Sequence, residues 1–270
     1  MKSIFKMLIF SSVFIFLFSC NGDEVDTTPP VIEFLNTSPQ PAEKLVCGEW
    51  DPQTLSGLGG GTLQMEVRIT DDIALSQLKI DIHPNFDCHG HRSYSTDDWL
   101  LLDLIDLEGT EIHKIIGLEV PQMVTAGLYH LQLRAVDESG NTSPVTDFWN
   151  LSIRNPADTI LPEFSVLHPT EQQLNYSRGE AMEFDLMITD NRPFNFGGNA
   201  RIELAYRGVN SSNTLIANEV FLSGETTSKE VSILFNIPQT LVKGDYTFFL
   251  NVWDGVNNLA EGKSFSVKIQ

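Results

Sequence analysis

The feature that most constrains the fold is an internal repeat. Three phrases recur in the same order along the 270 residues, at 26–34, 65–72 and 127–141, and again at 158–164, 182–190 and 244–258. The repeats span residues 28–154 and 159–270, and 155–158 reads as a short linker between them. A duplication of this length predicts two similar domains, each with its own hydrophobic core.

Both repeats consist of short alternating segments separated by turn residues, without long helical periodicity. This pattern predicts an all-β protein of two tandem immunoglobulin-like β-sandwich domains. In the first repeat we expect strands at 31–37, 62–70, 76–83, 98–105, 110–120, 127–136 and 146–154. In the second we expect them at 163–168, 181–189, 200–206, 215–222, 229–236, 244–253 and 262–269. The glycine-rich stretch 57–61 is expected to be a loop.

The N-terminus carries a targeting segment. Lys2 and Lys6 precede the apolar stretch 7–18, and the residues that end at Cys20 resemble the lipobox of bacterial lipoproteins. We therefore expect a signal peptide at 1–19, a lipid on Cys20 and a lipidated tether at 20–27. The alternative is an ordinary secretory signal followed by a free cysteine. The prediction is a lipid-anchored outer-membrane protein, and the net charge of −19 argues against a nucleic-acid partner.

Cys47 and Cys88 are the two remaining cysteines. In an exported protein, two such cysteines more often form a disulfide than stay as thiols. A Cys47–Cys88 disulfide would hold the histidine-rich stretch 80–91 in place. In the alternative interpretation, Cys88 is a thiolate metal ligand beside His89.

Histidines cluster in the first repeat. Alternation turns Leu78, Ile80 and Ile82 inward and His83 outward, and it turns His130 outward in the strand at 127–136. These two strands are antiparallel neighbours in an immunoglobulin sandwich, so the two imidazoles should lie side by side. The predicted transition-metal site consists of His83, His89, His91 and His130, with His113 as an optional fifth member. Zinc suits such ligands best, and copper or nickel are alternatives.

The second repeat serves as an internal comparison. Thr247 stands where the first repeat has His130, and the counterpart of 83–91 has no histidine. The sandwich itself therefore does not need these histidines, which favours a site added to one of two similar scaffolds. No positioned general base or known catalytic motif accompanies them, so we expect binding without catalysis.

Carboxylates follow the strands that meet at one end of each sandwich. They are Asp71, Asp72 and Asp137 in the first repeat, and Asp190 and Asp254 in the second. Such residues could bind calcium. Turn chemistry is the favoured explanation, because Asp side chains bond to nearby backbone and no twelve-residue calcium loop is present. Tyr129 and Tyr246 resemble the tyrosine-corner position, where we expect a structural role.

The phrases at 81–91, 127–130 and 137–141 together resemble domain of unknown function family 4625, immunoglobulin-like lipoprotein domains of Bacteroidota. The resemblance covers residues 28–154, and the second repeat is a degenerate copy without the histidines. It implies the fold and a cell-surface setting, to which the acidic tether after Cys20 also conforms. It implies no activity.

The sequence thus predicts a non-catalytic cell-surface lipoprotein with a zinc site on its first domain. The alternative is a glycan- or protein-binding module or spacer of a nutrient-uptake system, without metal. Its aromatic platform would come from Trp50, Trp99 or Trp149. A metalloenzyme is a third interpretation, which would require an open coordination position and a pocket.

Overall fold

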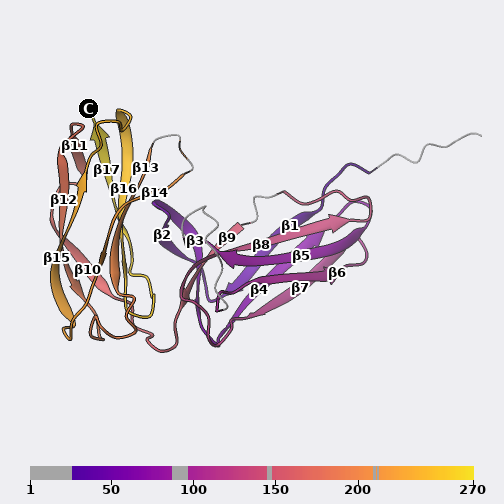
Figure 1. The fold of residues 1–270 in the computed structure, drawn as a ribbon. Helices are drawn as coiled ribbons and strands as arrows, with labels where there is room; N and C mark the ends of the chain where they lie inside the picture. The colour runs from indigo at the N-terminus through magenta and orange to yellow at the C-terminus, as the bar shows by residue number, and fades with distance from the viewer. Residues whose placement is uncertain (1–25, 87–96, 145–147, 209–210, 212) are drawn as a thin grey trace, which may run out of the picture.

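The computed structural model describes residues 26–86, 97–144, 148–208, 211 and 213–270. These residues form four β-sheets that make two sandwich-like bodies, with the second body on the left of Figure 1. The all-β, two-sandwich prediction is confirmed. In the described part of the chain, no helix is both long and apolar enough to cross a membrane.

The first body packs a three-stranded sheet against a six-stranded sheet. The smaller sheet has the order β1-β4-β7, with strands at Val31–Ser38, Thr62–Thr70 and Glu111–Glu119. The larger has the order β2-β3-β9-β8-β5-β6. Its strands lie at Ala42–Val46, Glu49–Leu58, Phe148–Arg154, Gly127–Asp137, Leu75–Pro84 and Leu101–Asp106.

The second body repeats this plan with fewer strands. One sheet has the order β10-β12-β15, with strands at Glu163–His168, Ala181–Thr189 and Ser228–Asn236. The other has the order β11-β17-β16-β13-β14. Its strands lie at Gln173–Tyr176, Lys263–Ile269, Gly244–Trp253, Arg201–Gly208 and Leu215–Phe221.

Alternation along β5 and β8 explains the first core. Leu78, Ile80 and Ile82 of β5 are at most 1% exposed, while the residues between them face outward. On β8 the inward set is Tyr129, Leu131, Leu133 and Ala135, all at most 1% exposed. Because side chains alternate across a strand, burying these residues turns the histidines of both strands to the outer face.

A hairpin of β2 and β3 is the main element that the sequence patterns do not predict. It also corrects the expected loop at 57–61, because Gly57 and Leu58 belong to β3 and pair in parallel with Ile153 and Arg154 of β9. A β-carbon on Gly57 would lie 2.7 Å from the Ile153 side chain. This glycine therefore allows the close strand approach that a flexible loop would not need.

The β2–β3 hairpin also joins the two bodies (Figure 1). Leu45 packs with Ala205 and Phe249 of the second body in a small buried cluster. The Arg207 guanidinium donates to Glu49 Oε1 at 2.6 Å and also to the Cys47 carbonyl. These contacts combine apolar burial with charge-assisted hydrogen bonds across the junction.

Both predicted tyrosine corners are confirmed. The Tyr129 hydroxyl donates to the Thr125 carbonyl at 2.6 Å, and the Tyr246 hydroxyl donates to the Val242 carbonyl at 2.6 Å. Tyr129 also accepts from the Trp99 backbone N–H at 3.4 Å. Tyr129 is 0% exposed and Tyr246 is 9% exposed.

These contacts predict unequal costs for losing the two hydroxyls. Tyr129→Phe should lower the free energy of unfolding by about 2 kcal/mol, because it removes two hydrogen bonds, to the Thr125 carbonyl and from the Trp99 N–H, at a hydroxyl on a fully buried residue. Tyr246→Phe should cost about 1 kcal/mol, since Val242 is 74% exposed and water can replace the bond. Urea unfolding of the two variants measures the difference, and equal costs would contradict this explanation.

Candidate metal centre

The predicted pairing of His83 and His130 is present. The two residues are direct cross-strand partners of β5 and β8. Their ring centroids lie 5.4 Å apart, with the ring planes at 86°. Both side chains are on the outer face and half-buried. In Figure 1, β5 ends and β8 begins at the end of the first body that faces the second body.

Asp81 orients the first imidazole. Its Oδ1 lies 3.0 Å from His83 Nδ1, and its Oδ2 lies 3.1 Å from Lys79 Nζ. Burial raises the pKa of Asp81, but the hydrogen bonds and charges of His83 and Lys79 outweigh it and bring the pKa below its usual value. The carboxylate is therefore ionised at neutral pH and favours a proton on His83 Nδ1, which leaves the Nε2 lone pair available.

Two further predicted ligands, His89 and His91, lie outside the described residues, as does Cys88, which is predicted to form a disulfide with Cys47. Cys47 is described: it is 7% exposed and disulfide-bonded. Its Sγ accepts from Asn85 Nδ2 at 3.5 Å, and its side chain packs near Leu128. Cys47 thus lies beside the end of β5 and the start of β8, next to the histidine pair. A disulfide with Cys88 stays a prediction.

His113 lies elsewhere. It sits on β7 in the other sheet of the first body, opposite Arg68. Its Nε2 is 3.2 Å from Glu111 Oε1, and its side chain is 58% exposed. The structure therefore does not bring this optional fifth member to the His83–His130 pair.

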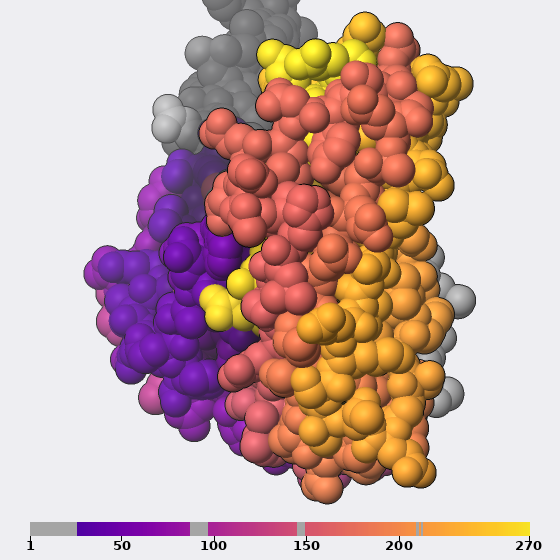
Figure 2. All heavy atoms as spheres, turned by 90° about the vertical axis from the view of Figure 1, so that its left-hand side faces the viewer, coloured from indigo at the N-terminus to yellow at the C-terminus, as the bar shows by residue number. Residues whose placement is uncertain are grey.

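The three candidate tryptophans differ in burial. Trp99 and Trp149 are 4% and 7% exposed and belong to the first core. Trp50 is 49% exposed. It lines a cavity of about 740 Å³ together with Phe164, Glu261 and Lys263 of the second body. In Figure 2 the yellow C-terminal segment is visible between the purple first body and the salmon segment of the second.

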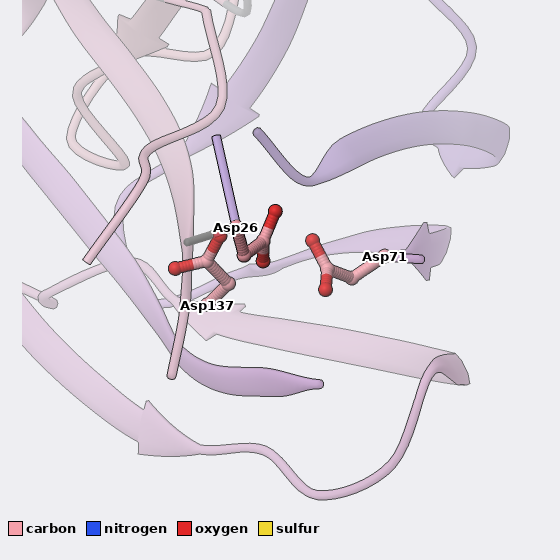
Figure 3. A group of neighbouring side chains, drawn as sticks. All are labelled: Asp26, Asp71 and Asp137. Carbon is pink, nitrogen blue, oxygen red and sulfur yellow. The ribbon is translucent and has the colours of Figure 1, made fainter. Parts of the chain in front are cut away.

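The predicted acidic residues form two related groups. In the first body, Asp71 and Asp137 meet Asp26, and one ligand oxygen from each lies within 4.8 Å of the others. Figure 3 shows the three carboxylates facing one another. Asp72 is exposed and is not a member of this group. Asp26 is not among the residues predicted from the sequence, because it precedes the first strand, although it begins the repeated phrase.

In the second body, the Asp190 charge interacts with both Asp158, which also begins the repeated phrase, and Asp254. Asn258 Nδ2 donates to the Asp158 carbonyl and to Asp254 Oδ2. Burial and, to a smaller extent, the Asp190 charge raise the pKa of Asp254 to about 6, although hydrogen bonds from Asn258 and Val256 lower it. In the first body, burial also raises the pKa of Asp137, but hydrogen bonds from Asn141, Gly140 and Ser139 lower it below its usual value.

The raised pKa of Asp254 predicts a pH effect on stability. A carboxyl whose folded pKa exceeds its unfolded value binds more protons when folded, so stability is lost as pH rises between about 4 and 6. The shift from 3.8 to about 6 corresponds to about 3 kcal/mol. Carboxyl NMR titration should give a midpoint near 6 for Asp254 and a lower-than-usual midpoint for Asp137. A midpoint near 4 for Asp254 would contradict the predicted pH effect.

The fold and the histidine pair define a class of protein: tandem immunoglobulin-like β-sandwiches with a candidate metal site on the first. The chain belongs to the family described as Domain of unknown function (DUF4625), which matches residues 18–152. A search of curated proteins gives no match.

A search of solved structures finds matches of low similarity. A superoxide reductase (neelaredoxin) from Ignicoccus hospitalis is 10% identical, with a TM-score of 0.30 over 42% of this chain and 84% of its own. The GspB Siglec domain is 19% identical, with a TM-score of 0.29 over 42% and 59%. A structure of Dpr2 Ig1-Ig2 in complex with DIP-Theta Ig1-Ig3 is 12% identical, with a TM-score of 0.28 over 90% and 99%. At such TM-scores, the likeness says nothing about what this chain binds.

Proposed function

We propose that this protein is a lipid-anchored cell-surface protein whose first body binds one transition-metal ion, zinc foremost. The ligands in the described part of the chain are His83 and His130. Their facing pair on adjacent strands is the observation that carries the proposal. The role is metal capture or metal-stabilised binding of a partner, without catalysis.

The spacing of the two rings supports a shared ion. Two imidazoles bound to one tetrahedral zinc at about 2.1 Å have ring centroids about 5 Å apart. The observed separation is 5.4 Å. A metal could therefore bridge the two rings with little movement of the strands, and the site is organised before the ion arrives.

The surroundings supply orientation and further ligands. Asp81 holds His83 Nδ1, as carboxylates commonly hold the free nitrogen of a metal-binding imidazole. In the sequence, His89 and His91 follow Pro84, the last residue of β5, by five and seven residues. The disulfide-bonded Cys47 next to that end would restrict the segment that carries them. Copper and nickel also accept such ligands, so they are the alternatives to zinc.

Metal analysis of the chain from Asp23 onward tests the proposal. The purified protein, incubated with zinc and freed of excess, should hold about one zinc per chain, as a four-ligand site implies. His89→Ala/His91→Ala should lose it. Absence of zinc, copper and nickel from the wild-type chain after such incubation would overturn the proposal.

A second candidate function follows from the exposed Trp50. A cavity of about 740 Å³ between two bodies has the size and position of many ligand sites. An exposed indole beside Glu261 and Lys263 could stack on a sugar while the charged groups bond to its hydroxyls. The protein would then be a glycan-binding or spacer module of a nutrient-uptake system.

The intrinsic fluorescence of Trp50 distinguishes this alternative. Titration with a panel of soluble polysaccharides should change the wild-type emission and leave that of Trp50→Phe unchanged. The metal site should be unaffected by that substitution. If no polysaccharide in the panel changes the wild-type signal, the glycan function is rejected.

A further inference from the structure

We propose that the first body binds a hard divalent cation, calcium, between Asp26, Asp71 and Asp137. The site is independent of the histidine pair. It lies where the chain enters the first body and where β4 and β8 end, at the end away from the second body (Figures 1 and 3). A bound cation would tie the N-terminal segment to two loops of the first sandwich.

Each carboxylate is held in place by one set of hydrogen bonds. Asp26 Oδ1 accepts from Thr28 N at 2.9 Å, and Asp71 Oδ1 accepts from Ala74 N at 2.8 Å. Asp137 accepts from both the backbone and side-chain nitrogen of Asn141, each at 2.7 Å. The carboxylates are thereby oriented before any ion binds, which reduces the entropy cost of binding.

The second carboxylate oxygen of Asp137 accepts from Asn141 Nδ2, whereas those of Asp26 and Asp71 differ. Asp26 Oδ2 and Asp71 Oδ2 are buried and accept no hydrogen bond in the described part of the chain. Asp137 is 2% exposed. Among the described residues, no Lys, Arg or His forms a salt bridge with any of the three. Buried acceptors and three close negative charges are costly unless a positive charge compensates them.

The second body independently shows that a positive charge belongs at this position. Asp158 occupies the place of Asp26: its Oδ1 accepts from Ile160 N, and its carbonyl accepts from Asn258 Nδ2. The matching bonds in the first body come from Thr28 and Asn141. The Asp158 side chain is 3% exposed and its Oδ2 accepts no hydrogen bond, yet the Arg192 guanidinium lies 3.8 Å from that oxygen.

The first body lacks this built-in cation. Arg192 N donates to Asp190 Oδ1 just as Ile73 N donates to Asp71 Oδ1, so Ile73 is the structural counterpart of Arg192. Asp72 likewise corresponds to Asn191, whose Nδ2 bonds to Asp158 Oδ1. Where the second body carries a guanidinium and an amide, the first carries an exposed isoleucine and an exposed carboxylate. Among the described residues no Lys, Arg or His pairs with the three carboxylates, so a diffusible cation would supply the positive charge.

The ligand chemistry selects the class of ion. All three ligands are carboxylates, which suit calcium or magnesium rather than soft metals. Oxygens bound to one calcium at about 2.5 Å lie at most about 5 Å apart, and the three here lie within 4.8 Å. Calcium accepts irregular geometry and completes its shell with water, whereas magnesium demands a near-ideal octahedron.

Isothermal titration of the chelator-treated chain from Asp23 onward with calcium chloride tests the proposal. The wild-type protein should bind one calcium, and Asp71→Asn should bind at least about tenfold more weakly. Glu138→Gln is the matched control, because this exposed carboxylate neighbours Asp137 but lies outside the group; it should bind like the wild type. No calcium binding by the wild type, or equal affinity in Asp71→Asn, would overturn the proposal.

A variant that copies the second body controls for misfolding. Asp72→Asn/Ile73→Arg supplies the amide and guanidinium found beside Asp158. It should unfold at a higher temperature than the wild type without calcium and show no further rise when calcium is added. The unfolding temperature of the wild type should rise by several degrees when the protein is saturated with calcium. His83→Ala/His130→Ala should still bind calcium, which separates this site from the histidine pair. A calcium-dependent rise in the arginine variant equal to that of the wild type would refute the site.

Hydrogen exchange tests the consequence for the chain entry. Calcium should slow amide exchange at Thr28 and in the 71–74 turn of the wild type, because the ion links these segments. Exchange should not change in Asp71→Asn. Unchanged exchange at both segments in calcium-saturated wild-type protein would contradict the proposed coordination.

Discussion

His130→Ala is expected to lower the zinc affinity of the protein about 100-fold or more. The substitution removes one of the two facing imidazoles and leaves the rest of β8 intact, because the side chain is on the outer face. Asp81→Asn should cost about 10–100-fold, since it weakens only the bond that orients His83. Competition with a chromogenic chelator measures the zinc affinities of the wild type and of the two variants.

His113→Ala is the matched control for that series. It removes an imidazole from the same body, but from an exposed position in the other sheet. Its zinc affinity should equal that of the wild type. If His130→Ala and His113→Ala bind zinc equally well, the facing pair is not the metal site, and the proposed function fails.

Gly48→Ala is expected to lower the free energy of unfolding by about 2–4 kcal/mol. Gly48 has a φ of +82° in the turn between β2 and β3, which disfavours any residue with a β-carbon. The added atom would also lie 2.5 Å from Phe249 Cε1. Phe249 is 1% exposed and packed against Leu45 and Ala205, so its ring has little room to move.

Gly109→Ala is the control that separates the cost of the positive φ from the cost of the contact with Phe249. Gly109 has a φ of +83°, but nothing lies within 4 Å of its added β-carbon. It should therefore cost only about 1 kcal/mol, which is the backbone share. Equilibrium urea unfolding compares the two. Equal costs would mean that the hairpin yields to the added methyl group, and that the junction is looser than its packing indicates.

Local periodicity predicts most of the strands in this protein. β4, β7, β12 and β17 lie within the expected bounds, because each has a clear alternation of more and less buried residues. The β2–β3 hairpin breaks that rule. Pro52 interrupts β3, and Leu45 of β2 is buried against the second body rather than in the first core. Alternation along 42–58 is therefore weak.

The residues of the candidate sites also fall into those that the sequence predicts and those that depend on distant contacts. His83 and His130 could be paired from sequence because strand parity and the neighbouring strands of an immunoglobulin sheet determine their positions. The Asp26 carboxylate could not be assigned, because it precedes every regular element and nothing local indicates its neighbours. The placement of His113 in the other sheet likewise depends on pairing between distant strands.

The sequence by itself determined two β-sandwiches, their inward faces and the outward histidine pair, since these follow from alternation between neighbouring residues. Tertiary structure alone decided how the bodies join and which charges are compensated. The bond from Arg207 to Glu49 spans 158 residues, and Asn141 reaches the Asp26 carbonyl across 115. No local pattern encodes such contacts, because they depend on how whole sheets pack against each other.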